Sequence, residues 1–182
     1  FYFLARPRRF GKSLFLSTLA AYFEGKRELF KGLAIDRLQP DPWETHPILR
    51  LDMSGKSYTD TDSLVAKLEG VLDQWDEKYG LKTNKFPFDM RFQEIIRVLA
   101  QKEGKRVVVL VDEYDNPLAS VIEKENLFQL YQEQLHGFYS VLKAAEDHIQ
   151  FCMLTGVTRF GKVSVFSGLN NLRDISMENG FA

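Results

Sequence analysis

The chain has 182 residues, of which 45% are apolar and 27% are charged. This composition is typical of globular proteins and excludes a disordered or fibrous chain, and the length favours a single domain over residues 1–182. The formal net charge of −1 excludes an overall basic surface of the kind that binds nucleic acid.

Cysteine use and hydropathy set the expected location. No stretch approaches the roughly 18 to 20 consecutive apolar residues of a membrane-spanning helix, so we expect no membrane partner. The single cysteine, Cys152, has no second cysteine in the chain with which to form a disulfide, and this suits a reducing compartment. We therefore expect a cytoplasmic protein.

The first predicted elements are a strand and a helix. Phe1 to Ala5 form a short apolar run that Pro7 stops, as in a buried strand. From Lys12 the apolar residues follow a helical period until Gly25, a typical helix stop. The predicted apolar face of this helix consists of Leu14, Phe15, Leu19, Tyr22 and Phe23. Because the chain starts at Phe1 rather than at Met, we expect it to belong to a longer protein.

The middle of the chain continues the alternation of strands and helices. A short helical or irregular piece is expected at 29–35, before a proline-rich connection. Three further elements follow: a strand at 48–53, a helix that Asp60 or Thr61 caps and that ends at Gly80, and a helix through 92–99 that ends before Gly104.

The strongest strand signal is the run Val107 to Val111, five branched apolar residues without alternation. Such a run predicts a parallel strand that is buried on both faces. Asn116 is expected to cap a helix with Pro117 at its first position, a longer helix is expected at 127–145, and a fourth strand at 149–154. The alternation predicts an α/β fold with a mainly parallel sheet and helices on both faces. Ligands of such sheets bind at the carboxyl ends of the strands.

Between the first strand and the first helix lies the end of a phosphate-binding loop, or Walker A motif. Gly11-Lys12-Ser13 matches the end of G-x-x-x-x-G-K-[ST]. In this motif the lysine neutralises the β and γ phosphates of a nucleotide, the hydroxyl binds Mg²⁺, and backbone amides cradle the phosphates. The predicted nucleotide-binding residues are Arg8, Arg9, Phe10, Gly11, Lys12, Ser13 and Leu14.

Arg6 stands where the pattern has its first glycine. Arginine lacks the freedom of glycine at positive φ, so we expect the start of the loop to depart from the usual turn. Two interpretations of the arginines in this loop remain open. Either they add positive potential for a triphosphate, or they only solvate the loop.

A second motif follows the strongest strand. Asp112 comes where the apolar run ends, the place of a Walker B aspartate that holds Mg²⁺, and Glu113 is placed to activate an attacking water. Taken alone, the pair is better explained as a helix cap or a solvent-facing pair. Combined with Gly11-Lys12-Ser13 after an earlier strand, it indicates a nucleotide site.

Three segments together resemble a known family. FLARPRRFGKSLFLSTL at 3–19, VVVLVDEYDNPL at 107–118 and LTGVTRFGKVSVFSGLNNLRDIS at 154–176 are similar to the AAA-ATPase-like domain of prokaryotic proteins. In that family the loop reads R-P-R-R-F-G-K-[ST], so an arginine in place of the first glycine is its usual form. The resemblance implies a P-loop NTPase with an additional strand between the Walker A and Walker B strands. It also implies ATP as the nucleotide and, in many members, a C-terminal PD-(D/E)XK nuclease-like domain.

The resemblance also suggests roles for single residues. Thr155 corresponds to a polar sensor near the γ-phosphate, or it is an ordinary strand-terminating threonine. Arg159 and Arg173 are either charge-stabilising arginines or surface arginines. Asp115 either shapes the turn before the next helix or contacts metal, and Asp52 is equally open.

The function expected from these motifs is ATP binding with Mg²⁺-dependent hydrolysis to ADP and phosphate. The catalytic residues would be Lys12, Glu113 and Thr155, and Mg²⁺ would be held by Ser13 and Asp112. The alternative is a nucleotide-binding switch or interaction module with little hydrolysis. A small-molecule phosphotransferase would need an acceptor pocket that the sequence does not display. Nucleic acid is a weaker expectation, since it rests on the nuclease-like partner domain alone, and the sequence does not reveal an oligomeric state.

Overall fold

A computed structural model describes residues 1–39, 42–55, 57–158, 165–169 and 171–178. Within this part of the chain a parallel sheet has the strand order β2-β3-β4-β1-β5. The strands are β1 (Tyr2–Ala5), β2 (Ile48–Asp52), β3 (Val107–Asp112), β4 (Ile149–Gly156) and β5 (Arg173–Asp174). The predicted parallel α/β fold is therefore confirmed. The additional strand between the two motif-bearing strands, β1 and β3, is β4.

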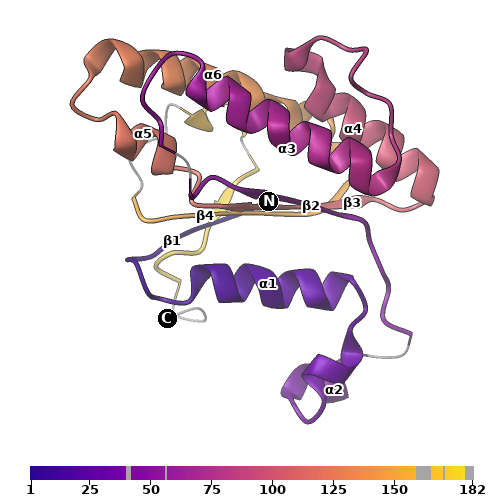
Figure 1. The fold of residues 1–182 in the computed structure, drawn as a ribbon. Helices are drawn as coiled ribbons and strands as arrows, with labels where there is room; N and C mark the ends of the chain where they lie inside the picture. The colour runs from indigo at the N-terminus through magenta and orange to yellow at the C-terminus, as the bar shows by residue number, and fades with distance from the viewer. Residues whose placement is uncertain (40–41, 56, 159–164, 170, 179–182) are drawn as a thin grey trace.

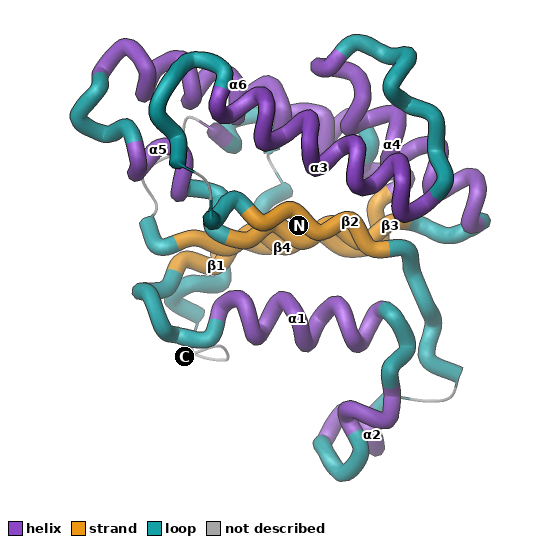
Figure 2. Tube along the Cα trace, in the orientation of Figure 1, coloured by secondary structure: helices purple, strands orange, loops and turns teal. Residues whose placement is uncertain are grey.

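Helices cover both faces of the sheet, as expected (Figure 1). The α-helices are α1 (Lys12–Phe23), α2 (Ala34–Leu38), α3 (Ser63–Tyr79), α4 (Phe88–Glu103), α5 (Asn116–Ser120) and α6 (Glu125–Ala144). Two 3₁₀ turns lie at Arg27–Phe30 and Glu146–His148. Figure 2 shows α1 alone along one face, while α3, α4 and α6 lie on the other; α2 projects beyond the end of α1. No described helix is both long and apolar enough to cross a bilayer.

The glycines predicted to end helices are confirmed, whereas the predicted caps are shifted: Asp62, not Asp60 or Thr61, directly precedes α3. Gly80 and Gly104 adopt left-handed conformations (φ 59° and 63°) just after α3 and α4, where glycine avoids the steric cost of a Cβ. The carboxylate of Asp60 accepts hydrogen bonds from the amide and the hydroxyl of Ser63 (2.9 and 2.8 Å), the first residue of α3. The predicted cap of α5 was wrong by one residue, because the helix begins at Asn116 and Asp115 precedes it.

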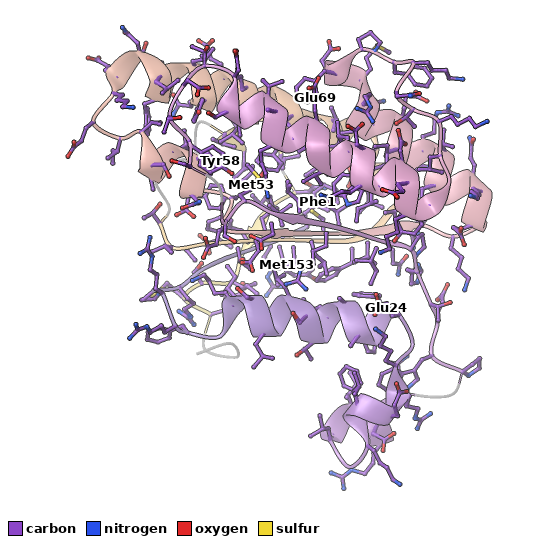
Figure 3. All side chains as sticks on the ribbon, in the orientation of Figure 1. Phe1, Glu24, Met53, Tyr58, Glu69 and Met153 are labelled. Atoms are coloured by element: carbon purple, nitrogen blue, oxygen red, sulfur yellow. The ribbon has the colours of Figure 1, made fainter. Side chains whose placement is uncertain are left out.

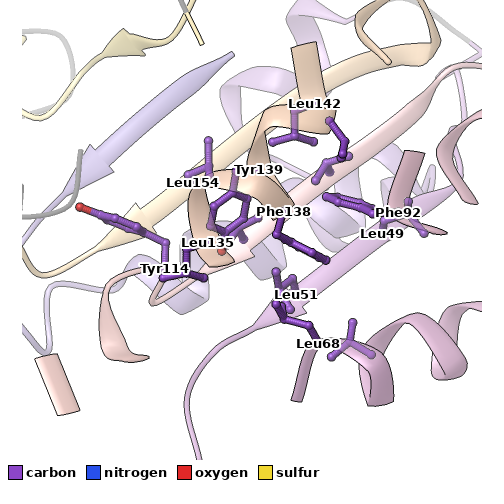
Figure 4. Packing of buried hydrophobic residues seen from close by; sticks show 14 of the residues in the cluster. Leu49, Leu51, Leu68, Phe92, Tyr114, Leu135, Phe138, Tyr139, Leu142 and Leu154 are labelled. Atoms are coloured by element: carbon purple, nitrogen blue, oxygen red, sulfur yellow. The ribbon is translucent and has the colours of Figure 1, made fainter. Parts of the chain in front are cut away.

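The two faces of β3 explain its unbroken apolar sequence. All six residues of the strand are buried. Val107, Val109 and Val111 belong to the larger core under α3, α4 and α6, part of which Figure 4 shows. Val108 and Leu110 point to the other face and pack in the smaller core with Leu16 of α1. Met153 of β4 lies in the same layer, between the sheet and α1 (Figure 3).

The expected apolar face of α1 was partly wrong. Leu14 is 72% exposed, whereas Leu16 is fully buried against the sheet. Phe15, Leu19 and Phe23 are only partly buried around it. Two residues along a helix rotate the side chain by roughly 200°, so Leu14 and Leu16 cannot share one face.

The edge strand β5 was not predicted. It has only two residues, both of them charged, and so carries no apolar pattern. The strand forms because β1 offers a free edge: Tyr2 and Phe3 pair with Arg173 and Asp174. The ladder continues as the amide of Ile175 donates to the carbonyl of Phe3 (2.9 Å).

Candidate functional site

The carboxyl ends of β1, β4 and β3 bring the two sequence motifs to one edge of the sheet. Leu4 of β1 is in register with Thr155 of β4, and Val111 of β3 is in register with Leu154. The phosphate loop that follows β1 and the Asp112–Glu113 pair that ends β3 therefore flank Thr155. This is the edge at which parallel sheets bind ligands.

The loop between β1 and α1 does not need a glycine at its first position. The positive φ angles in the loop belong to Arg9 (67°) and Gly11 (73°), and Arg6 is not among them. Instead, the amide of Arg6 donates to the carbonyl of Gly156 (3.1 Å), one step beyond the end of the paired strands. The loop therefore starts as an extension of β1, which is the expected departure from the usual turn.

Lys12 is folded into the loop and is only 7% exposed. Its Nζ donates to the carbonyls of Arg6 (2.9 Å) and Pro7 (3.1 Å), so the ammonium lies at the centre of the loop. Ser13 is exposed beside it, and Phe10 and Leu14 are exposed apolar residues at the same helix start. An anion that enters the loop would meet the ammonium and the N-terminal amides of α1.

Asp112 and Thr155 form a buried pair across β3 and β4. The Thr155 hydroxyl donates to Oδ1 of Asp112 at 2.7 Å, and Thr155 and Asp112 are 0% and 3% exposed, respectively. This bond fixes the orientation of the carboxylate, while Oδ2 has no hydrogen-bond donor among the described residues. A carboxylate held by one oxygen is well suited to direct the other toward a water of a Mg²⁺ shell.

Glu113 lies next to Asp112 in a conformation that non-glycine residues rarely adopt (φ 53°). Burial raises the pKa of its carboxyl group, and the nearby charges of Asp112 and Asp52 raise it further. Lys12 and Arg8 oppose this rise in pKa, so the carboxylate is within electrostatic reach of the phosphate loop. Strained backbone and a raised pKa together are typical of functional positions.

A cavity of about 230 Å³ adjoins this carboxylate. Its lining residues are Arg8, Glu113, Asp115, Asn116, Ala119, Val157 and Thr158. The cavity connects the phosphate loop, the turn after β3 and the chain after β4. One water molecule occupies about 30 Å³ of liquid volume, so this space can hold several waters beside Glu113.

Tyr114 and Asp115, which follow Glu113, form hydrogen bonds with the chain that leaves β4. The Asp115 carboxylate accepts hydrogen bonds from the amides of Val157 (3.1 Å) and Thr158 (2.7 Å) and from the Thr158 hydroxyl (2.7 Å). The buried Tyr114 hydroxyl donates to the carbonyl of Thr158 (2.9 Å). The geometry thus gives Asp115 a structural function that neither sequence interpretation proposed.

The sequence analysis left the roles of three other residues open, and the structure places two of them. Asp52 is in register with Asp112, at the exposed end of β2, and accepts a bond from the Ser54 amide (2.8 Å). Arg173 is exposed in β5 and pairs with Glu178 (2.7 Å). Arg159 lies outside the described residues.

The described residues contain no group of three or more His, Cys, Asp or Glu side chains placed to hold a metal ion by themselves. A nucleotide-dependent Mg²⁺ site does not need such a group, because the phosphates supply part of the coordination. The Ser13 hydroxyl and the Asp112 carboxylate are the chemical types that Mg²⁺ takes from such a protein, so the residues present fit this ion.

Comparison with protein families agrees with this arrangement. A family model described as "Predicted AAA-ATPase" matches residues 1–166. The chain belongs to the AAA-ATPase-like family.

A relative of this AAA-ATPase-like chain is a protein of Azotobacter chroococcum mcd 1, named "Uncharacterized protein in vnfD 5'region". It is 42% identical over 184 residues. The match spans all of the present chain but only 35% of the relative, so the chain covers about a third of that protein's length. No solved structure matches the chain.

Proposed function

We propose that this chain binds ATP together with Mg²⁺ and hydrolyses it to ADP and phosphate. The observation that carries the proposal is the convergence of the Lys12 loop with the buried Asp112–Thr155 pair at the carboxyl ends of β1, β3 and β4. The family description supports it, since the family is named for a predicted ATPase. ATP rather than another nucleotide rests on the family alone.

The binding residues act on the phosphates. On nucleotide binding, the Lys12 ammonium exchanges the carbonyls of Arg6 and Pro7 for the β and γ phosphates. Loop amides from Arg8 to Leu14 cradle the phosphates at the start of α1. Ser13 and Asp112 would hold Mg²⁺, which would supply charge neutralisation for the phosphates.

The reaction is an attack of water on the γ-phosphorus with ADP as the leaving group. Glu113 orients the water and accepts its proton, and the pKa of this carboxyl, raised by burial, makes it a better base than an ordinary glutamate. Thr155 keeps Asp112 in place and lies between the two motif-bearing strands. Positioning and charge stabilisation provide most of the catalysis in such reactions.

Calorimetric titration with ATP and Mg²⁺ tests the binding step. The unmodified chain should show saturable binding that Lys12→Ala weakens by at least about 100-fold, since it removes a buried cation from the phosphate site. Lys31→Ala, at an exposed lysine outside the loop, is the matched control and should bind normally. GTP as competitor reports the base preference. Equal binding by Lys12→Ala and the unmodified chain would refute the site.

Phosphate release tests the hydrolysis step. Glu113→Gln keeps the size of the side chain but removes the base, so it should lower turnover by about 10²- to 10⁴-fold while ATP still binds. Trace release that Glu113→Gln leaves unchanged would instead identify a nucleotide-binding switch. Because the chain covers only a third of its relative, we propose that either activity serves further parts of a longer protein, among them a nuclease-like domain.

A further inference from the structure

The function proposed above leaves Arg6 without a role, although this residue replaces the first glycine of the general loop pattern. Its backbone already has two partners: the amide donates to Gly156 (3.1 Å), and the carbonyl accepts from Lys12 (2.9 Å). Its side chain is half-buried, and Nη1 donates to the backbone carbonyl of Ser176.

Ser176, the partner of Arg6, is itself buried and held by hydrogen bonds. The residue is only 1% exposed, and its hydroxyl accepts the amide of Ala5 (2.8 Å), the last residue of β1. Its own amide donates to the Asp174 carboxylate (2.9 Å). The chain from β5 to Ser176 therefore runs beside β1 as far as the phosphate loop. There the side chain of Arg6, the first residue of the loop, binds the carbonyl of Ser176.

We infer that Arg6 is a positioning residue that ties the start of the phosphate loop to the segment 173–178. This inference rests on the proposed nucleotide site. When Lys12 leaves the Arg6 and Pro7 carbonyls for a phosphate, the loop loses two internal hydrogen bonds. The Arg6–Ser176 contact then holds the start of the loop in place of the lost bonds. By the reciprocity of linked equilibria, a bound nucleotide in turn stabilises segment 173–178.

Hydrogen exchange measured by mass spectrometry tests this connection directly. Arg6→Gly restores the general pattern and removes the tether, so exchange in peptides that cover 173–178 should rise about 3- to 10-fold without nucleotide, in line with the net contribution of a typical hydrogen bond. Arg8→Ala is the matched control: it removes another guanidinium from the same loop, and exchange at 173–178 should stay unchanged. If Arg6→Gly does not fold, Arg6→Gln is measured in its place.

Nucleotide provides the second readout. ADP with Mg²⁺ should slow exchange at 173–178 in the unmodified chain, and this protection should be absent in Arg6→Gly even at saturating ADP. Unchanged exchange at 173–178 in Arg6→Gly, accompanied by weaker nucleotide binding, would overturn the inference and make Arg6 a direct phosphate ligand. A chain that binds no nucleotide would refute the proposed function, while the nucleotide-free comparison would still decide whether the tether exists.

Discussion

At the scale of single residues, two carboxylates and two cationic side chains act electrostatically on Glu113 in the candidate site. Asp112 is buried and held by Thr155, and Asp52 lies in register with it on the neighbouring strand. Burial is the main cause of the raised pKa of Glu113, and these two carboxylates raise it further. Lys12 and Arg8 counteract them from the phosphate loop. The protonation state of Glu113 is therefore set by residues from three separate parts of the chain.

This charge arrangement predicts the pH dependence of hydrolysis. As the proposed base, Glu113 must be ionised, and its pKa lies above the usual 4.5, so turnover should fall as the pH drops through that raised pKa. Asp52→Asn removes a negative charge that raises the pKa. The acid limb of the kcat profile should therefore move to lower pH in Asp52→Asn. A limb that stays in place, or moves to higher pH, would show that Glu113 does not control the reaction.

At the scale of elements, the turn after β3 packs closely against the end of β4 and is hydrogen-bonded to it. Tyr114 is fully buried, and its amide donates to the Thr155 carbonyl (3.0 Å). Its ring passes so close to Gly156 that a Cβ there would lie 2.5 Å from Cε1 of the tyrosine and 2.7 Å from Oδ1 of Asp115. Gly156 is therefore required for space rather than for an unusual φ angle.

The close approach predicts a clear stability difference between two glycines. Gly156→Ala should lower the free energy of unfolding by about 1–3 kcal/mol, because the buried Tyr114 and Asp115 must move. Gly137→Ala is the control: this glycine lies in α6, and apart from its chain neighbours and the nearby backbone of the helix, no atom of the described residues lies within 4 Å of the place that a methyl group would take. Alanine there should stabilise the helix by about 0.5–1 kcal/mol. Urea denaturation measures both, and equal stabilities would contradict the close packing.

At the scale of the whole molecule, the two faces of the sheet differ in their cover. Three long helices, α3, α4 and α6, bury one face, while α1 lies along the other (Figure 2). The core on the α1 side depends strongly on Leu16, the fully buried apolar residue of this helix. Since α1 also carries the phosphate loop at its start, the packing of Leu16 holds the site against the sheet.

Because α1 covers its face of the sheet through Leu16, truncation of two leucines of this helix should change the free energy of unfolding by different amounts. Leu16→Ala should lower the free energy of unfolding by about 2–5 kcal/mol through lost burial and a cavity. Leu14→Ala, two residues away and 72% exposed, should change it by less than about 0.5 kcal/mol. Thermal or urea unfolding of the two variants decides the matter. Similar losses for both would mean that α1 presents a different face to the sheet.

Apart from β5, the order of the strands and long helices, the parallel sheet class and the strand–loop–helix context of the phosphate motif all follow from the amino-acid sequence alone. These features are local: the run Val107 to Val111, the helix-ending Gly80 and Gly104, and Gly11-Lys12-Ser13 each carry their signal within a few residues. Local signals also placed Asp112 and Thr155 at strand ends. They did not predict the hydrogen bond between these two side chains.

Which distant segments meet depends instead on the assembled fold. The tether of Arg6 to Ser176 joins residues 170 positions apart, and strand β5 exists only because β1 offers it an edge. The partners of Asp115, 42 and 43 positions away, and the exposure of Leu14 likewise depend on how strands and helices are assembled. Hydrophobic periodicity shows that a residue is buried or paired, but the sheet order and the packing of layers determine its partner.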